Sequence, residues 1–115
     1  MTAALALAAF DVVVVRFPFT DRQASKRRPA LVLSSASFNT AALHSVLAMI
    51  TSAEQSAWPG DVAITDLVAA GLPANCLVRL KLFTLDHRLI VRRVGSLAAK
   101  DRAALATGWK TLVFQ

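Results

Sequence analysis

The sequence has few of the residues that build disulfide scaffolds or metal sites. One of its 115 residues is a cysteine, Cys76, which excludes an internal disulfide framework and a cysteine-based metal cluster. The two histidines, His44 and His87, do not have the short spacing of a pair of metal ligands. We therefore predict that the protein uses no metal and no other cofactor. A core alone is sufficient at this length, because such cross-links are usually needed only below about 40 residues.

Common catalytic motifs are also absent. The chain contains no GxSxG, no P-loop, no HExxH and no GxGxxG sequence. Cys76 lies in an apolar, strand-like run, which favours a buried and unreactive thiol. His44 and His87 are expected to have structural roles, and no pair of carboxylates has a spacing typical of acid–base catalysis. By ordinary criteria for enzymes, the sequence offers little catalytic chemistry.

Residues 29–53 carry no charge, although the chain has a formal charge of +6 and is 56% hydrophobic. A membrane-spanning helix needs about 20 predominantly apolar residues, and the serines and threonines of this stretch interrupt it. We therefore predict two buried strands here. Residues 1–10 lack the basic leader and the length of a signal peptide, so we expect a soluble cytoplasmic protein without a membrane segment. The apolar excess is expected to form a small core and the interface of a homodimer.

The basic residues form two groups, separated by residues 29–78, which contain no lysine or arginine. We expect the two groups to converge on one face of the folded protein. A basic face attracts the phosphate backbone of nucleic acids and acidic protein segments alike. The alternative is that these charges only keep an apolar protein soluble. The groups are Arg16, Arg22, Lys26, Arg27 and Arg28, and Arg79, Lys81, Arg88, Arg92 and Arg93.

Strand-like patterns dominate the chain, which fits a single domain of residues 1–115 with residues 1–9 as a candidate flexible extension. Residues 98–114 have helical composition but no residue that caps the start. Ser37 is expected to cap one short helix and Gly71 to end another. We predict an α+β fold, mainly β, built as a small barrel with short helices and a C-terminal helix. Strands are predicted at 11–19, 29–34, 45–51, 61–65, 76–83 and 90–97, and short helices at 37–42 and 66–70.

Arginines next to hydroxyl groups are the remaining chemical feature. Arg28 precedes Pro29 at the start of one predicted strand, and Thr51 ends the next. Such residues suit RNA cleavage, because the neighbouring 2′-hydroxyl of RNA is the nucleophile and no metal is required. The protein then orients the backbone, moves protons and stabilises a pentacoordinate phosphorane, for which arginine and threonine supply donors. From these residues alone, an ordinary charged turn before a strand is the simpler interpretation.

Short strings of sequence follow one another at characteristic spacings: DVVVVRFPFTD (11–21), SKRRPALVLSS (25–35), an isolated Asn39, MITS (49–52), WPGDVAI (58–64), AGL (70–72) and VRLKLFTLD (78–86). Together they resemble the PemK/MazF family of toxins of type II toxin–antitoxin systems. The resemblance implies an SH3-like barrel assembled as a homodimer. It also implies a sequence-specific, metal-independent endoribonuclease that cleaves single-stranded RNA and arrests growth, and a cognate antitoxin that neutralises it.

By this resemblance, Arg28 and Thr51 are the catalytic residues. Arg28 would take part in proton transfer and stabilise the phosphorane, and Thr51 would stabilise the developing charge. Because the pKa of a free arginine is above about 12, charge stabilisation is the firmer role for Arg28. The predicted RNA-binding residues are Lys26, Arg27, Ser52, Arg79 and Lys81.

Two positions depart from the family pattern. Phe10 stands where the family usually has glycine, so the turn before the first strand is expected to differ. Lys81 stands where some members have an acidic residue that helps catalysis. If a carboxylate is required, the protein must recruit another one, with Asp86 and Asp21 as candidates; otherwise it works without one.

Two other functions stay open. Toxins of the same fold that poison gyrase bind a protein and catalyse nothing, in which case the C-terminal helix with Trp109 would form the contact surface. An inactive module would use its basic face only to hold RNA or an acidic antitoxin tail. The arginine–proline and isoleucine–threonine–serine motifs favour the nuclease, because a poison needs neither.

Overall fold

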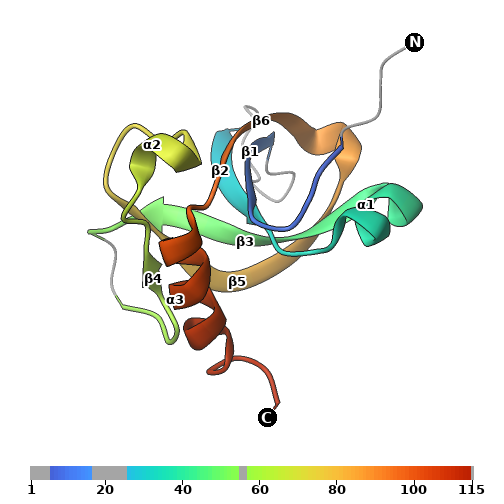
Figure 1. The fold of residues 1–115 in the computed structure, drawn as a ribbon. Coiled ribbons are helices and arrows are strands. Elements are labelled where there is room, and N and C mark those ends of the chain that lie inside the picture. The colour runs from blue at the N-terminus through green and yellow to red at the C-terminus, as the bar shows by residue number, and fades with distance from the viewer. Residues whose placement is uncertain (1–5, 17–25, 55–56, 115) are drawn as a thin grey trace.

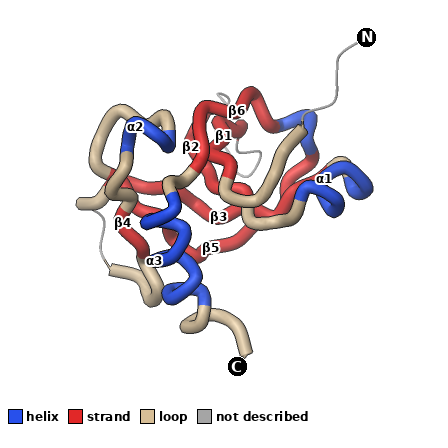
Figure 2. The backbone as a smooth tube through the Cα atoms, viewed as in Figure 1, coloured by secondary structure: helices blue, strands red, loops and turns tan. Residues whose placement is uncertain are grey.

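The computed structural model describes residues 6–16, 26–54 and 57–114. Within these residues, six strands form one antiparallel sheet in the order β4-β5-β3-β2-β1-β6 (Figure 1). Helices α2 and α3 lie together near one end of the sheet and α1 lies at the other (Figure 2). The elements are β1 (Asp11–Arg16), β2 (Arg27–Val32), α1 (Ala36–Ala42), β3 (His44–Ser52), β4 (Val62–Ala63), α2 (Leu67–Ala70), β5 (Cys76–Asp86), the 3₁₀ turn η1 (His87–Leu89), β6 (Ile90–Ser96) and α3 (Ala99–Trp109). The fold is mainly β with short helices and a C-terminal helix, as predicted.

Apolar side chains are buried on both faces of the sheet. Val12 of β1 belongs to one buried cluster, whereas Val13 and Val15 belong to another. Because successive residues of a strand point to opposite faces, each face has its own cluster. The first core includes Ala70 of α2 and Leu105 of α3. This double burial accounts for a large share of the hydrophobic residues, and for a run of four valines in β1.

The uncharged residues 29–53 supply parts of two strands, as predicted. β2 pairs with β3 from Ala30–Met49 to Val32–Leu47. β3 in turn pairs with β5 along its whole length, with an irregularity in register after Ala48. No helix in the described part of the chain is long and apolar enough to cross a bilayer.

The short helices are set by their caps. Ser35, not the expected Ser37, caps α1, since its Oγ accepts a hydrogen bond from the N–H of Phe38. Helix α2 has Gly71 as C-cap, as predicted, whereas Asp66, expected as its first residue, is its N-cap. Gly71 has φ of +73°, and a Cβ there would lie 2.1 Å from the carbonyl oxygen of Val94. Only glycine allows α2 to pack this closely on β6.

Several boundaries differ from the predicted ones. β4 is only two residues long, because the N–H groups of Thr65 and Asp66 donate to the buried carboxylate of Asp101 instead of to a strand. Helix α3 begins without a side-chain cap, as expected, but ends at Trp109 rather than 114. β5 continues to Asp86, three residues beyond the predicted end. β1 ends at Arg16, and the predicted continuation to 19 lies outside the described residues.

The residues before β1 are fixed to the rest of the fold. Leu7 is buried in the second core, so residues 6–9 of the candidate flexible extension pack against the protein; residues 1–5 lie outside the described part. Phe10 has φ of +75°, the left-handed conformation that glycine favours. Its N–H donates to Val32 and its carbonyl accepts from Leu97. Phenylalanine therefore adopts a glycine-type backbone in this turn.

Candidate active site

The two predicted catalytic residues lie on neighbouring strands. Thr51 is the penultimate residue of β3 and is half-buried, opposite Leu77 of β5. Arg28 is the second residue of β2 and is exposed. The pairing of β2 with β3 ends at Ala30–Met49, and continuing this register by two residues places Arg28 level with Thr51. Strand pairing therefore brings the two residues to the same end of the sheet.

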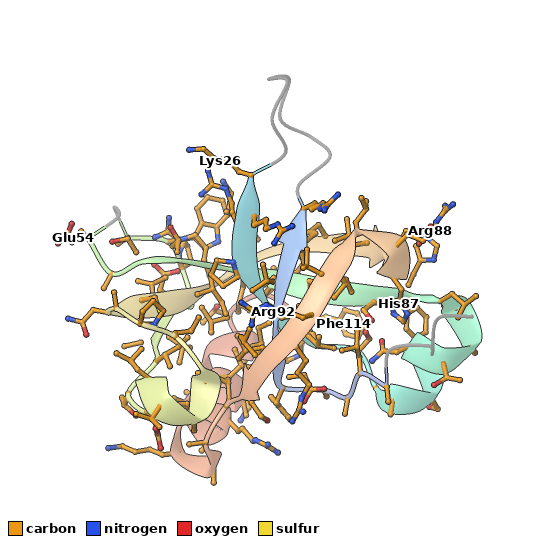
Figure 3. The ribbon with its side chains drawn as sticks, turned by 90° about the horizontal axis from the view of Figure 1, so that it is seen from above. Lys26, Glu54, His87, Arg88, Arg92 and Phe114 are labelled. Atoms are coloured by element: carbon orange, nitrogen blue, oxygen red, sulfur yellow. The ribbon has the colours of Figure 1, made fainter. Side chains whose placement is uncertain are left out.

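A shallow hollow of about 310 Å³ adjoins the start of β2. Three arginines border it, Arg27, Arg28 and Arg92, and none of them forms an ion pair with any residue that the structure describes. Figure 3 shows Lys26 at the outer end of β2, with Arg92 on the neighbouring part of the sheet. The edge of the hollow is therefore basic, although most of its lining is apolar. Its other lining residues are Val14, Pro29, Gly71, Leu72, Pro73 and Val94.

Arg79 lies opposite Met49, two residues from Thr51 along β3, but its guanidinium is already engaged. Its Nε and Nη2 donate to the two carboxylate oxygens of Asp61 at 3.1 and 2.9 Å, and Arg79 is only 8% exposed. The hydrogen bonds from Arg79 lower the pKa of Asp61, so the carboxylate stays charged. Arg79 therefore reaches the site as half of an ion pair and not as a free cation.

Lys81 and Trp58 form the neighbouring contact. The Lys81 ammonium lies 4.8 Å from the centroid of the Trp58 ring, a cation–π distance, and Trp58 is 40% exposed. The main-chain N–H of Trp58 donates to Asp61, which ties this contact to the Arg79 ion pair. Sequence reasoning missed Asp61 and Trp58 as parts of the site, because the WPGD string was interpreted only as a turn. The signal available in the sequence was the pair of cationic residues Arg79 and Lys81 in the strand that follows this turn, since such residues pair with acidic or aromatic side chains.

The expected recruitment of Asp86 is wrong. Asp86 pairs in register with His44, seven residues before Thr51, which is roughly 23 Å along a strand. Its carboxylate binds Arg88, whose hydrogen bonds hold the pKa of Asp86 far below its usual range. The other candidate, Asp21, lies outside the described residues. Asp61 is a carboxylate at the β3–β5 end of the site, through its contact with Arg79.

The remaining predicted residues flank the same end of the sheet. Lys26 directly precedes β2 and is exposed. Ser52 is exposed at the end of β3, where its Oγ accepts from the N–H of Glu54. Cys76 pairs in register with Ser52 and is partly buried. Burial raises the pKa of the Cys76 thiol, which agrees with an unreactive side chain.

A second polar cluster lies at the opposite end of β3 and β5, beside α1; His87 marks it in Figure 3. We call Ser34, Asn39, Ser45 and His87 the α1 network. Asn39 is 1% exposed; its Oδ1 accepts from the hydroxyls of Ser34 and Ser45, and its amide donates to the carbonyls of Leu7 and Ser34. The Ser45 hydroxyl donates its hydrogen to Asn39, so in its contact with His87 it can only accept. Nε2 of His87, 2.8 Å from Ser45 Oγ, is therefore the protonated nitrogen and the donor.

Comparison with known proteins gives a family and a fold. Residues 8–112 match the model of PemK-like, MazF-like toxins of type II toxin–antitoxin systems. A search of curated proteins gave no match.

Solved structures of low sequence identity share the fold. An endoribonuclease from a Mycobacterial species, solved with its cognate antitoxin, superposes with a TM-score of 0.74 at 17% identity, covering 96% of this chain and 100% of that one. MazF from Deinococcus radiodurans gives 0.72 at 23% identity over 94% and 96% of the two chains. The Mycobacterium tuberculosis toxin MazF-mt6 gives 0.69 at 20% identity over 85% and 90%. The match to the family model covers nearly the whole chain, so this protein belongs to the PemK-like, MazF-like toxins of type II toxin–antitoxin systems.

Proposed function

We propose that this toxin is a metal-independent endoribonuclease that cleaves single-stranded RNA in the cytoplasm. The observation that carries the proposal is the pairing of β2 with β3, which, continued two residues beyond its last pair Ala30–Met49, sets exposed Arg28 level with Thr51. Arg28 also borders a hollow whose arginines have no ion-pair partners among the described residues, although Thr51 does not line that hollow. Support also comes from relatives of the same fold that are endoribonucleases. RNA suits this site, because it supplies its own nucleophile and the site supplies donors for phosphate oxygens.

In the proposed reaction, the 2′-hydroxyl attacks the adjacent phosphorus. The 2′-oxygen–phosphorus bond forms, the bond from phosphorus to the 5′-oxygen breaks, and the products are a 2′,3′-cyclic phosphate and a 5′-hydroxyl. The proton of the 2′-hydroxyl leaves to a base, and the departing 5′-oxygen takes one up. Arg28 stabilises the negative charge of the phosphorane, and the Thr51 hydroxyl donates to the same group. Lys26, Arg27, Ser52 and Lys81 hold the RNA on either side, and Arg79 contributes through its ion pair with Asp61.

A cognate antitoxin and a second copy of the chain are the proposed partners. Three of the similar structures are complexes: an endoribonuclease with its cognate antitoxin, and two crystal forms of MazE-MazF. Apolar side chains such as Phe38, Leu82 and Leu112 are exposed in the single chain, and a homodimer would cover part of this surface. Light scattering at micromolar concentration should give about twice the chain mass of 12.3 kDa; a particle of one chain mass would contradict the homodimer.

The gyrase-poison alternative has less support. It needs the C-terminal helix to present Trp109, but Trp109 is half-buried and packs against the first core. Its indole therefore stabilises the fold and is not free as a contact surface.

Analysis of RNA products tests the proposal. The protein is incubated in EDTA with a mixed-sequence RNA, and with the same RNA carrying 2′-O-methyl groups throughout. We expect cleavage of the first RNA only, with 2′,3′-cyclic phosphate and 5′-hydroxyl ends, and no cleavage by Arg28→Ala. Cleavage of the methylated RNA, dependence on added metal, or no cleavage of either RNA would contradict it.

A further inference from the structure

The indole of Trp58 is a large apolar surface that the fold leaves open. Trp58 is 40% exposed, although tryptophan is usually well buried. Leu82 on β5 has the same exposed fraction, but its side chain lacks a planar face. One side of the Trp58 ring is contacted by the Lys81 ammonium. The exposed part of the ring is where a second planar group can stack.

The turn that carries Trp58 is held on two sides. The main-chain N–H of Trp58 donates to Asp61 Oδ2 at 3.0 Å, and the same carboxylate binds Arg79 of β5. Gly60 has φ of +81°, and a Cβ there would lie 2.5 Å from Thr111 Oγ1 beyond the end of α3. The turn is thus fixed by β5 and by the segment after α3. A ring held in this way loses little conformational freedom on binding a ligand.

This ring belongs to the same end of the sheet as Thr51. Alternate residues of β3 place Thr51 and Met49 on one face, and Arg79 lies opposite Met49. Arg79 binds Asp61, and Asp61 binds the main chain of Trp58. A short series of direct contacts therefore connects the indole with the strand that ends in the proposed catalytic threonine.

We propose that Trp58 is the platform on which a nucleobase of the bound RNA stacks, while Lys81 pairs with a phosphate of the same segment. The inference rests on the proposed function and adds a position that fixes the RNA next to the reacting phosphate. An aromatic ring beside a cation is the combination by which proteins hold single-stranded nucleic acid, because every base has a face that stacks and every nucleotide has a charge to pair.

A contact with a protein partner is the competing use of the same ring. The base is favoured because the Lys81 ammonium contacts the same ring and can pair with the charge that every nucleotide carries. Stacking by itself is tolerant of sequence, so Trp58 is expected to contribute affinity and position more than choice of base.

RNA binding by matched variants tests the platform. The probe is a mixed-sequence 2′-O-methyl oligonucleotide of about twelve residues, which the proposed reaction cannot cleave, and the dissociation constant is measured by fluorescence anisotropy. Trp58→Ala should bind roughly 5- to 150-fold more weakly. Trp58→Phe should keep most of the affinity. Leu43→Ala, which truncates an exposed apolar side chain at the α1 end of β3, should bind like the wild type.

Tryptophan emission gives a second measurement that does not depend on Trp58→Ala folding. The chain has two tryptophans, so Trp109→Phe leaves Trp58 as the single fluorophore and Trp58→Phe leaves Trp109. The oligonucleotide should quench the emission of the first variant and not that of the second. Unchanged RNA affinity in Trp58→Ala, or Trp58 emission unaffected by saturating oligonucleotide, would overturn the proposal. If Trp58→Ala binds RNA like the wild type but no longer binds a protein partner, the ring is a protein contact and the proposal is also overturned.

Cleavage of unmodified RNA by the wild type separates the two proposals. If the wild type cleaves RNA and Trp58→Ala binds the oligonucleotide as tightly as the wild type, the proposed nuclease function is supported and the stacking role of Trp58 is contradicted. If binding of the oligonucleotide depends on Trp58 but the wild type cleaves no RNA, the stacking role of Trp58 is supported and the nuclease function is contradicted. No binding of the oligonucleotide by the wild type would overturn the platform.

Discussion

The two ends of the β3–β5 pair carry polar clusters of opposite character. In the α1 network, Asn39 is buried and each of its hydrogen-bonding groups has a partner within the protein. At the Thr51 end, Arg27, Arg28 and Arg92 have no ion pair with a described residue, and Trp58 stays exposed. A closed network stabilises a fold, whereas donors left open to solvent are available to a ligand. Strand pairing alone therefore does not distinguish a site; the satisfaction of its polar groups does.

Substitution in the α1 network should have the largest effect on stability. Asn39→Ala leaves two buried hydroxyls and two carbonyls without their partner, so we expect the free energy of unfolding to fall by about 2–4 kcal/mol. Urea denaturation measures this change. Thr40→Ala, in the same helix but exposed, should change it by less than about 0.5 kcal/mol. A similar loss in both variants would show that the network is not special.

The Asp61–Arg79 pair should respond in both stability and binding. Asp61→Asn leaves the nearly buried Arg79 without its charged partner and loosens the turn of Trp58, so the thermal midpoint should fall and RNA should bind several-fold more weakly. Asn39→Ala, by contrast, should leave the RNA affinity of the folded protein unchanged. Equal RNA affinity in wild type and Asp61→Asn would show that this ion pair does not contribute to RNA binding.

The two ends should also lose stability in different ranges of pH. Burial and the nearby His44 lower the pKa of His87 below 6.5, so the folded state disfavours its protonated form. Stability from this group is complete above about pH 6.5 and is lost as the pH falls through the lowered pKa. The lowered pKa of Asp61 makes the stability depend on pH only below about pH 4, where this carboxylate begins to be protonated in the unfolded state. His87→Gln should remove the first loss in a series of urea titrations; a wild-type stability that is flat between pH 7 and 5 would contradict this assignment.

A small gain is expected at the end of α1. Leu43 has φ of +54° and is 58% exposed, so its side chain contributes little while its backbone is strained. Leu43→Gly should raise the free energy of unfolding by about 0.5–1 kcal/mol, seen as a higher thermal midpoint. Leu43→Ala keeps the strain and should not produce the gain.

The sequence predicted the fold more completely than the site. Runs of β-branched residues and the C-cap Gly71 act locally, so the strands and α2 were recognised, with errors at their ends. The short β4 could not be predicted, because Asp101, 36 positions away from Thr65, takes the N–H group that a longer strand would use.

The site was predicted only where motifs exist. Arg28 and Thr51 come from short strings, and the pairing of β2 with β3 gives them their common level. Asp61 and Trp58 belong to the site through contacts with β5 that no local pattern encodes. Asp86 was misplaced because distance along the sequence does not indicate which end of a long strand pair a residue occupies.

Single-turnover cleavage by two arginine variants tests the central claim most directly. Arg28 and Arg92 are both exposed and border the same hollow, but only Arg28 lies level with Thr51. In EDTA, Arg28→Ala should cleave an RNA substrate about 10²- to 10³-fold more slowly than the wild type, the usual loss when one donor to a developing charge is removed. Arg92→Ala should weaken RNA binding and change the rate at saturating protein by no more than about threefold. Cleavage by Arg28→Ala at the wild-type rate, or an equal loss of rate in both variants, would contradict the account.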